Sequence, residues 1–121
     1  MSPDGDWLCD ADYSWQQMYP GKPLKKDIIY RALKENFISI NTARGEMRVE
    51  SLSGSQPPLF TKFKVVRQKD NATTIAYLDE PNRHEVFTVV DQNTLLMHNT
   101  AQPKVKIRYK RTAGRQADDA E

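Results

Sequence analysis

The chain has 121 residues, close to the commonest size of one folded domain and too short for two separate hydrophobic cores. Apolar residues make up 38% and charged residues 28%, a polar composition that still lies outside the range of disordered chains. The net charge of +2 is too small to argue for nucleic acid, no stretch is apolar enough for a membrane span, and the single cysteine, Cys9, excludes an internal disulfide and a zinc site built from several cysteines.

The first predicted element is a strand over residues 5–15, where apolar and polar residues alternate with only Leu8 out of phase. Turn-forming residues at 19–23 end it. A short amphipathic helix near residues 24–36 is predicted next, because its apolar residues lie on one helical stripe. An extended segment through residues 27–30 is the alternative, since short apolar runs fit both periods.

The rest of the chain alternates runs of β-branched and aromatic residues with short polar turns. These runs predict strands over residues 37–41, 46–52, 60–68, 73–78, 85–90, 94–98 and 104–111. Gly45 stands in the first turn, where a positive φ is expected. Short connections imply antiparallel neighbours, so the predicted fold class is mainly β: a meander of about eight strands that closes into a small barrel. We expect one barrel domain over residues 1–111 and a flexible tail over residues 112–121.

Opposite charges near the two ends of the chain suggest how the barrel closes. Residues 1–15 carry four aspartates and no cation, whereas residues 103–115 carry six cations and no anion. If the first and last strands pair, each outward opposite-charge pair contributes roughly 0.2–1 kcal/mol. The predicted outward residues are Asp6, Asp10 and Asp12 beside Lys104, Lys106, Arg108 and Lys110, and the predicted inward ones are Trp7, Cys9, Ala11 and Tyr13 with Val105, Ile107 and Tyr109.

The triplet Gly5-Asp6-Trp7, the late cations and the meander together resemble the lipocalin-like (calycin) proteins. In that family the first strand opens with Gly-x-Trp, and an Arg of the last strand stacks over the Trp. The hairpin at residues 86–96 is also similar to small bacterial lipocalin-like domains. The resemblance covers about residues 5–111 and implies structural roles for Gly5, Trp7 and either Arg108 or Arg111, with Arg108 as the assigned partner. It implies no particular ligand.

Three functions follow from a barrel of this size. The leading hypothesis is a non-enzymatic binding module, because eight strands enclose just enough space for side chains or one small apolar ligand. The predicted ligand-binding residues are Trp15, Phe37, Phe63 and Tyr77. The first alternative is a protein-interaction or inhibitor domain that acts through loops 53–58 and 79–83.

The second alternative is a nucleic-acid-binding barrel that uses the basic last strand, with Tyr109 available to stack a base. Its candidate residues are Lys104, Lys106, Arg108, Lys110 and Arg111. The acidic first strand would neutralise these cations, so the sequence does not favour nucleic acid as a partner.

No catalytic site is predicted. His84 and His98 both lie beside turns without an accompanying Cys or carboxylate cluster, and neither a nucleophile-elbow triplet nor a glycine-rich phosphate loop is present. We therefore expect a protein that is not an enzyme and that needs no metal or cofactor. The compartment stays open: cytoplasmic if Met1 is native, periplasmic or secreted if a signal peptide has been removed.

Overall fold

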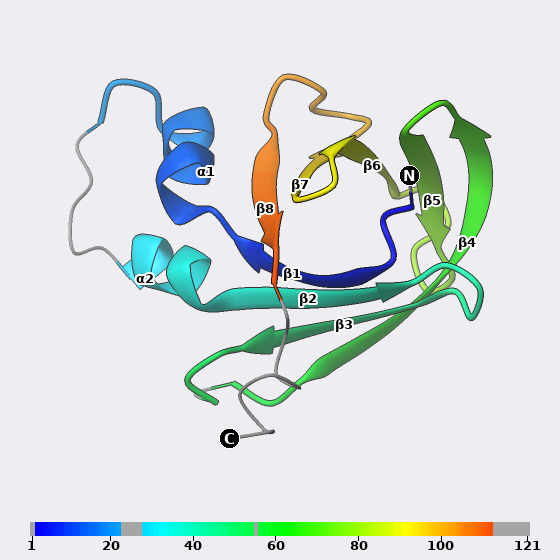
Figure 1. Cartoon of the computed structure of the whole chain (residues 1–121), viewed down its shortest axis with the longest axis horizontal. Helices are drawn as coiled ribbons and strands as arrows, with labels where there is room; N and C mark the ends of the chain where they lie inside the picture. Colours follow the sequence, from blue (N-terminus) through cyan, green and yellow to red (C-terminus); the bar gives the residue numbers. More distant parts are fainter. Residues whose placement is uncertain (1, 23–27, 55, 113–121) are drawn as a thin grey trace.

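A computed structural model shows a closed antiparallel barrel of eight strands, in which strands adjacent in sequence are adjacent in the barrel (Figure 1). The structure describes residues 2–22, 28–54 and 56–112. The elements are β1 Gly5–Cys9, α1 Ala11–Met18, α2 Ile28–Glu35, β2 Asn36–Asn41, β3 Glu46–Ser51, β4 Leu59–Lys69, β5 Ala72–Tyr77, β6 His84–Asp91, β7 Thr94–Asn99 and β8 Ile107–Arg111. The mainly β class and the closed meander of eight strands are confirmed. All but the first residue of the predicted tail lies outside the described residues.

The first predicted strand is wrong beyond Cys9, because residues 11–18 form helix α1. Asp10 caps this helix: its carboxylate accepts the N–H of Tyr13 at 3.4 Å, and its carbonyl accepts the N–H of Ser14 at 3.0 Å. Ala11 and Trp15, four residues apart, are both buried. Their spacing fits one face of a helix as well as one face of a strand, so alternation alone could not distinguish the two.

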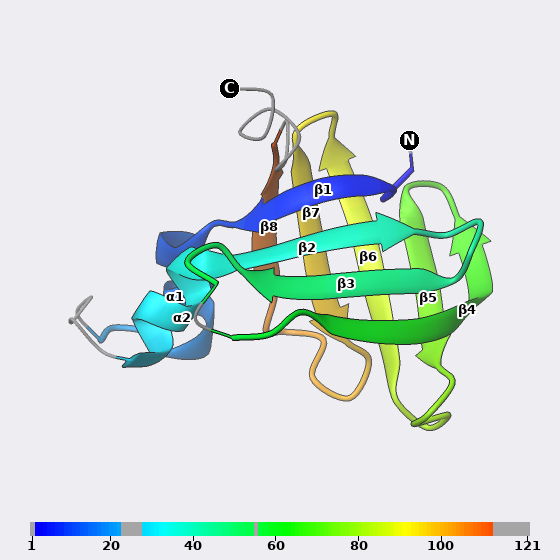
Figure 2. The same ribbon diagram turned by 90° about the horizontal axis from the view of Figure 1, so that it is seen from below.

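Helix α2 falls inside the predicted helix, and the predicted residues 24–27 lie outside the described ones. Its last residue, Glu35, is followed directly by β2. The two helices lie at the same end of the barrel (Figures 1 and 2). None of the residues of α2 is fully buried, but Leu33 packs against the core cluster at this end of the barrel.

The barrel interior is filled by side chains from alternate strand positions. Trp7, Ile75, Phe87 and Leu95 are each fully buried, and burying a large apolar side chain contributes about 1.5–3 kcal/mol. The whole cluster comprises Trp7, Cys9, Ile38, Ile40, Met47, Phe63, Ile75, Tyr77, Phe87, Val89, Leu95 and Tyr109.

Strands β1 and β8 close the barrel, as predicted, with Cys9 opposite Tyr109 and both facing the core. The predicted charge pairing occurs at Asp10, whose carboxylate accepts hydrogen bonds from Arg108 Nε at 2.8 Å and from Arg108 Nη2. Lys110 Nζ lies 3.9 Å from the same carboxylate.

The other two aspartates do not pair with the last strand, which corrects the prediction. Asp6 accepts a hydrogen bond from Ser39 Oγ at 2.6 Å, and Asp12 accepts one from the hydroxyl of Tyr30. Asp12 is on α1, so the loss of the predicted strand moves it away from β8.

Gly45 has the positive φ that was predicted, +63°. A Cβ at this position would lie 2.3 Å from the carbonyl oxygen of Phe63. We expect Gly45→Ala to lower the free energy of unfolding by about 2 kcal/mol or more, from the left-handed backbone and the clash together. Urea denaturation measures this. Gly54→Ala is the control, because Gly54 also has a positive φ but open space around it; equal losses for both variants would contradict the clash.

Candidate functional site

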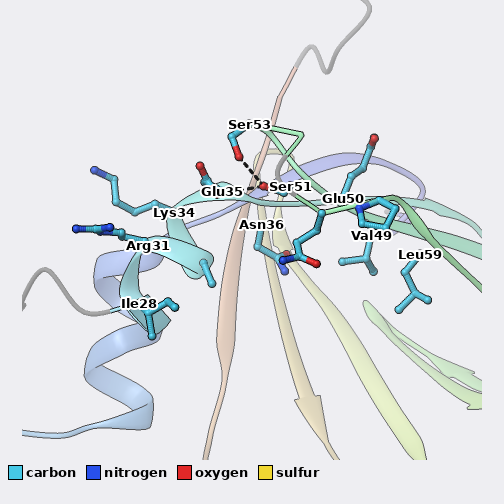
Figure 3. Close-up of a pocket in the computed structure, with 13 residues that line it drawn as sticks. Ile28, Arg31, Lys34, Glu35, Asn36, Val49, Glu50, Ser51, Ser53 and Leu59 are labelled. Carbon is cyan, nitrogen blue, oxygen red and sulfur yellow. Dashed lines mark hydrogen bonds between the residues drawn. The ribbon is translucent and has the colours of Figure 1, made fainter.

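A pocket of about 910 Å³ opens at the end of the barrel where α2 lies, between this helix, the end of β3 and the start of β4 (Figure 3). Ligand pockets in proteins commonly measure about 300–1,000 Å³. The apolar residues of its described lining are Ile28, Ala32, Val49, Pro57 and Leu59. Its polar and charged lining includes Arg31, Lys34, Glu35, Asn36, Glu50, Ser51, Ser53 and Gln56.

The strand register directs one wall of the pocket toward the barrel interior. Val49 pairs with Ile38 on one side and with Leu59 on the other, so these side chains share the inward face. Asn36 precedes Ile38 by two residues and lies on that face too. Asn36, Val49 and Leu59 point in the same direction in Figure 3. Val49 packs against the buried cluster, so the pocket ends where the filled core begins.

Polar groups are buried in the same barrel. The hydroxyl of Tyr109 donates to Asn36 Oδ1 at 3.1 Å. The hydroxyl of Tyr77 donates to Glu85 Oε1 at 2.6 Å, and Arg83 Nη2 donates to the same oxygen at 3.0 Å. Burial raises the pKa of both phenols, and the Glu85 carboxylate raises the pKa of Tyr77 further. Both tyrosines are therefore neutral hydrogen-bond donors at physiological pH.

The structure places the four predicted ligand-binding residues apart from the pocket. Phe63 and Tyr77 belong to the packed core cluster. Trp15 is on α1, with its ring 4.6 Å from that of Tyr19. Phe37 is buried outside the core cluster, because its neighbour Ile38 takes the inward position. None of the four is among the described residues that line the pocket.

Sequence reasoning missed the residues that do line it. The sequence shows the apolar residues of this surface, but only the structure shows that they are exposed: Ile28 is 81% exposed, and Leu59, which follows two prolines, is 62% exposed. Apolar side chains left in water at neighbouring positions indicate a surface that a ligand or partner can cover.

The Gly-x-Trp triplet has its cation partner, but that partner is Arg111. The guanidinium of Arg111 lies 4.2 Å from the centre of the Trp7 ring and donates to the carbonyl of Asp4 at 3.0 Å. A Cβ at Gly5 would lie 2.5 Å from Arg111 Nη1, so the glycine makes room for the cation. The role assigned to Arg108 is thereby corrected, since the register places Arg111 opposite Trp7.

The basic last strand is largely engaged within the protein. Arg108 pairs with Asp10 and lies 4.2 Å over the ring of Tyr13. Tyr109 is 3% exposed and sits in the core, so its ring is not available to stack a base. Of the candidate nucleic-acid residues, Lys104 and Lys110 are exposed, and Lys106 is partly exposed.

The two histidines lie near each other on the outer face of the barrel. In the antiparallel pair of β6 and β7, His98 is opposite Val86, which is two residues from His84, so both histidines are on the same face at the same end of the pair. Burial lowers the pKa of His98, and the nearby charge of Lys106 lowers it further. No group of three or more potential metal ligands occurs among the residues described. Within the same ranges, no helix has the length and apolar character needed to cross a bilayer.

Comparison with known proteins identifies no relative of this chain. No protein-family model matches the chain, and no curated protein and no solved structure matches it significantly. The chain is therefore described by its fold alone, as a closed eight-stranded antiparallel barrel consistent with a lipocalin-like form.

Proposed function

We propose that this protein is a non-enzymatic binding module that holds a small, mainly apolar ligand in the pocket at the barrel mouth. The observation that carries the proposal is the pocket itself, which has the size of a ligand site and borders a filled core. Because the barrel centre is occupied by side chains, the ligand lies between α2 and strands β3 and β4.

The lining gives such a ligand an orientation. Ile28, Val49 and Leu59 offer apolar contact, and covering their exposed surface contributes about 25 cal/mol per Å². Arg31 and Lys34 come from the same helix and point away from the pocket in Figure 3. An apolar body would therefore lie inward, and a polar end would lie at the rim. Glu35 and Glu50 line the pocket as well, so the charges of its described lining balance and do not favour an anion.

The buried reactive groups support a function without catalysis. Burial raises the pKa of the Cys9 thiol to about 11, although a hydrogen bond to Ser14 opposes this. The thiol is therefore protonated at neutral pH and is a poor nucleophile. The buried phenols are likewise held neutral.

Nile red, a dye that fluoresces in apolar surroundings, tests the proposal. We expect saturable binding at one site per chain, and we expect Val49→Trp to weaken it at least tenfold, because the indole would occupy the pocket. Val90→Trp is the matched control, since Val90 is 51% exposed and does not line the pocket. Unsaturable dye binding, or an equal loss in both variants, would contradict a ligand site at the mouth.

A second candidate function is a protein-interaction domain that acts through the loop at residues 53–58. The observation in its favour is the exposed apolar surface beside this loop, at Leu52 and at Leu59 and Phe60 of β4. This reading predicts no saturable dye site, so the Nile red titration separates the two functions.

A further inference from the structure

The outer face of β4 carries positive charges that the described structure leaves largely unpaired. The strand contains four cations and no acidic residue. Lys62 Nζ lies 3.8 Å from Glu46 Oε1. Lys64, Arg67 and Lys69 form no ion pair with any residue in the described ranges. We call Lys62, Lys64, Arg67 and Lys69 the β4 cationic stripe.

A β-bulge keeps the stripe on one face. Lys64 pairs with Ala76 between two inward pairs, so it points outward. Strict alternation would then place residues 66 and 68 outward. The register shifts at residue 66, and Arg67 and Lys69 therefore face outward opposite Thr74 and Ala72. The bulge thus aligns four cations along the whole strand.

A shallow trough runs beside the stripe. The outward side chains of β5 beside Arg67 and Lys69 are small, Ala72 and Thr74, whereas Ala76 beside Lys64 is buried. A groove of about 530 Å³ lies at the end of β4 that carries Arg67 and Lys69. These two cations line one side, Thr74 and Thr88 line the other, and Asp70 lies at its edge. The groove open to solvent therefore lies at the Arg67 and Lys69 end of the stripe.

An exposed aromatic ring stands at the other end of the same face. Phe60 pairs with Arg48 outside the barrel and is 73% exposed. Nine residues of extended chain, about 30 Å, separate Phe60 from Lys69. Binding to a membrane explains this face less well. Phe60 and the apolar mouth could enter a membrane surface, but Arg67 and Lys69 at the other end of the strand have no large apolar side chain beside them on β5 to hold them there.

We propose that the outer face of β4 and β5 binds single-stranded nucleic acid independently of base sequence. The β4 cationic stripe contacts successive phosphates, and Phe60 stacks on a base, which is how proteins hold single strands without reading them. This site is separate from the mouth pocket and does not rest on the proposed ligand. It also differs from the last strand, whose arginines are engaged inside the protein.

Fluorescence anisotropy with labelled mixed-sequence oligonucleotides of about 15 nucleotides, as DNA and as RNA, tests the proposal between 50 and 200 mM salt. We expect the triple variant Lys64→Gln/Arg67→Gln/Lys69→Gln to bind at least tenfold more weakly at the lowest salt. The slope of log affinity against log salt should fall by about 2, since each single-strand phosphate contact contributes about 0.7. Phe60→Ala should weaken binding about fivefold or more.

The matched control is Lys104→Gln/Lys106→Gln/Lys110→Gln, which removes the same charge elsewhere and should change affinity less than threefold. Equal losses in the two triple variants would show attraction to net charge and overturn the site. So would an absence of binding at 50 mM salt, or stripe-dependent binding to anionic phosphatidylglycerol vesicles without binding to oligonucleotides.

If the triple variant fails to fold by circular dichroism, Arg67→Gln alone takes its place. Nile red binding should be unchanged in every stripe variant, which keeps this test separate from that of the mouth pocket.

Discussion

Replacing Trp7 with alanine is expected to lower the free energy of unfolding by about 3–5 kcal/mol, a large part of the ~5–15 kcal/mol that holds a domain folded. Trp7 is fully buried in the core. Its indole N–H donates to the carbonyl of Pro3 at 2.8 Å, and Arg111 covers its ring. The substitution leaves a cavity where the first and last strands meet. Urea denaturation followed by circular dichroism measures the loss.

A double-mutant cycle separates the stacked pair from the burial. Trp7→Ala and Arg111→Met should show a coupling of about 0.5–2 kcal/mol, which is the range for a cation over a desolvated ring. The same cycle with Arg108→Met should show almost none, since Arg108 lies over Tyr13. A larger coupling to Arg108 than to Arg111 would contradict the assignment of Arg111 as the partner of Trp7.

The second large effect is expected at the seam between β1 and β8. Asp10→Ala should lower the free energy of unfolding by about 2–3 kcal/mol, because it removes both the helix cap of α1 and the charged hydrogen bonds from Arg108. Asp10→Asn should lose less, since asparagine caps a helix as well as aspartate does. The difference in unfolding free energy between Asp10→Ala and Asp10→Asn measures the contribution of the helix cap. The loss in Asp10→Asn relative to the native chain measures the contribution of the negative charge. Asp6→Asn is the control, because Asp6 bonds to Ser39 and not to a cation.

The charge of Asp10 also predicts a dependence on pH. Desolvation raises the pKa of this carboxyl, but the hydrogen bonds from Arg108 and Tyr13 and the charges of Arg108 and Lys110 outweigh it, so the pKa lies below its ordinary value of 3.8. A carboxyl with a lowered pKa stabilises the folded state above its unfolded pKa and loses that contribution as the pH falls through its folded pKa. The stability difference between the native chain and Asp10→Asn should be constant from about pH 5 to 8 and shrink below about pH 4. A difference that persists at the lowest pH would contradict the charge contribution.

Charge reversal tests the same pair. Arg108→Glu should destabilise the barrel, and adding Asp10→Lys should restore part of the loss. Lys106→Glu with Asp12→Lys should show no such recovery, because Asp12 bonds to Tyr30 on the helical side of the molecule. Equal recovery in both pairs would indicate a general effect of net charge and not a specific ion pair.

Most of the strand order was predictable because its causes are local. β-branched and aromatic runs separated by short polar turns leave few arrangements other than a meander, and the later strands lie within a few residues of their predicted bounds. Gly45 was predictable for the same reason, since a tight turn requires a positive φ. The opposite charges of the two ends of the chain predicted that the first and last strands close the barrel. Of the predicted charge pairs, the ion pair between Asp10 and Arg108 is one that forms.

The residues that define the candidate sites depended on contacts between distant segments. Whether Arg108 or Arg111 covers Trp7 is set by the register of strands about a hundred residues apart. The mouth pocket exists because α2 ends at Glu35 and leaves Val49 and Leu59 partly uncovered beside it. Neither fact is encoded in a local pattern.

The sequence by itself determined a mainly β chain with eight strands in meander order, because the alternation of side chains and the chemistry of turns act over a few residues. Only the tertiary structure decided that α1 replaces the end of the first strand, since the cap at Asp10 gains from contacts with β8 that no short segment contains. It also decided which face of β4 carries its charges. A single bulge at residue 66 shifts the alternation, and the pairing with β5 shows that shift where the sequence does not.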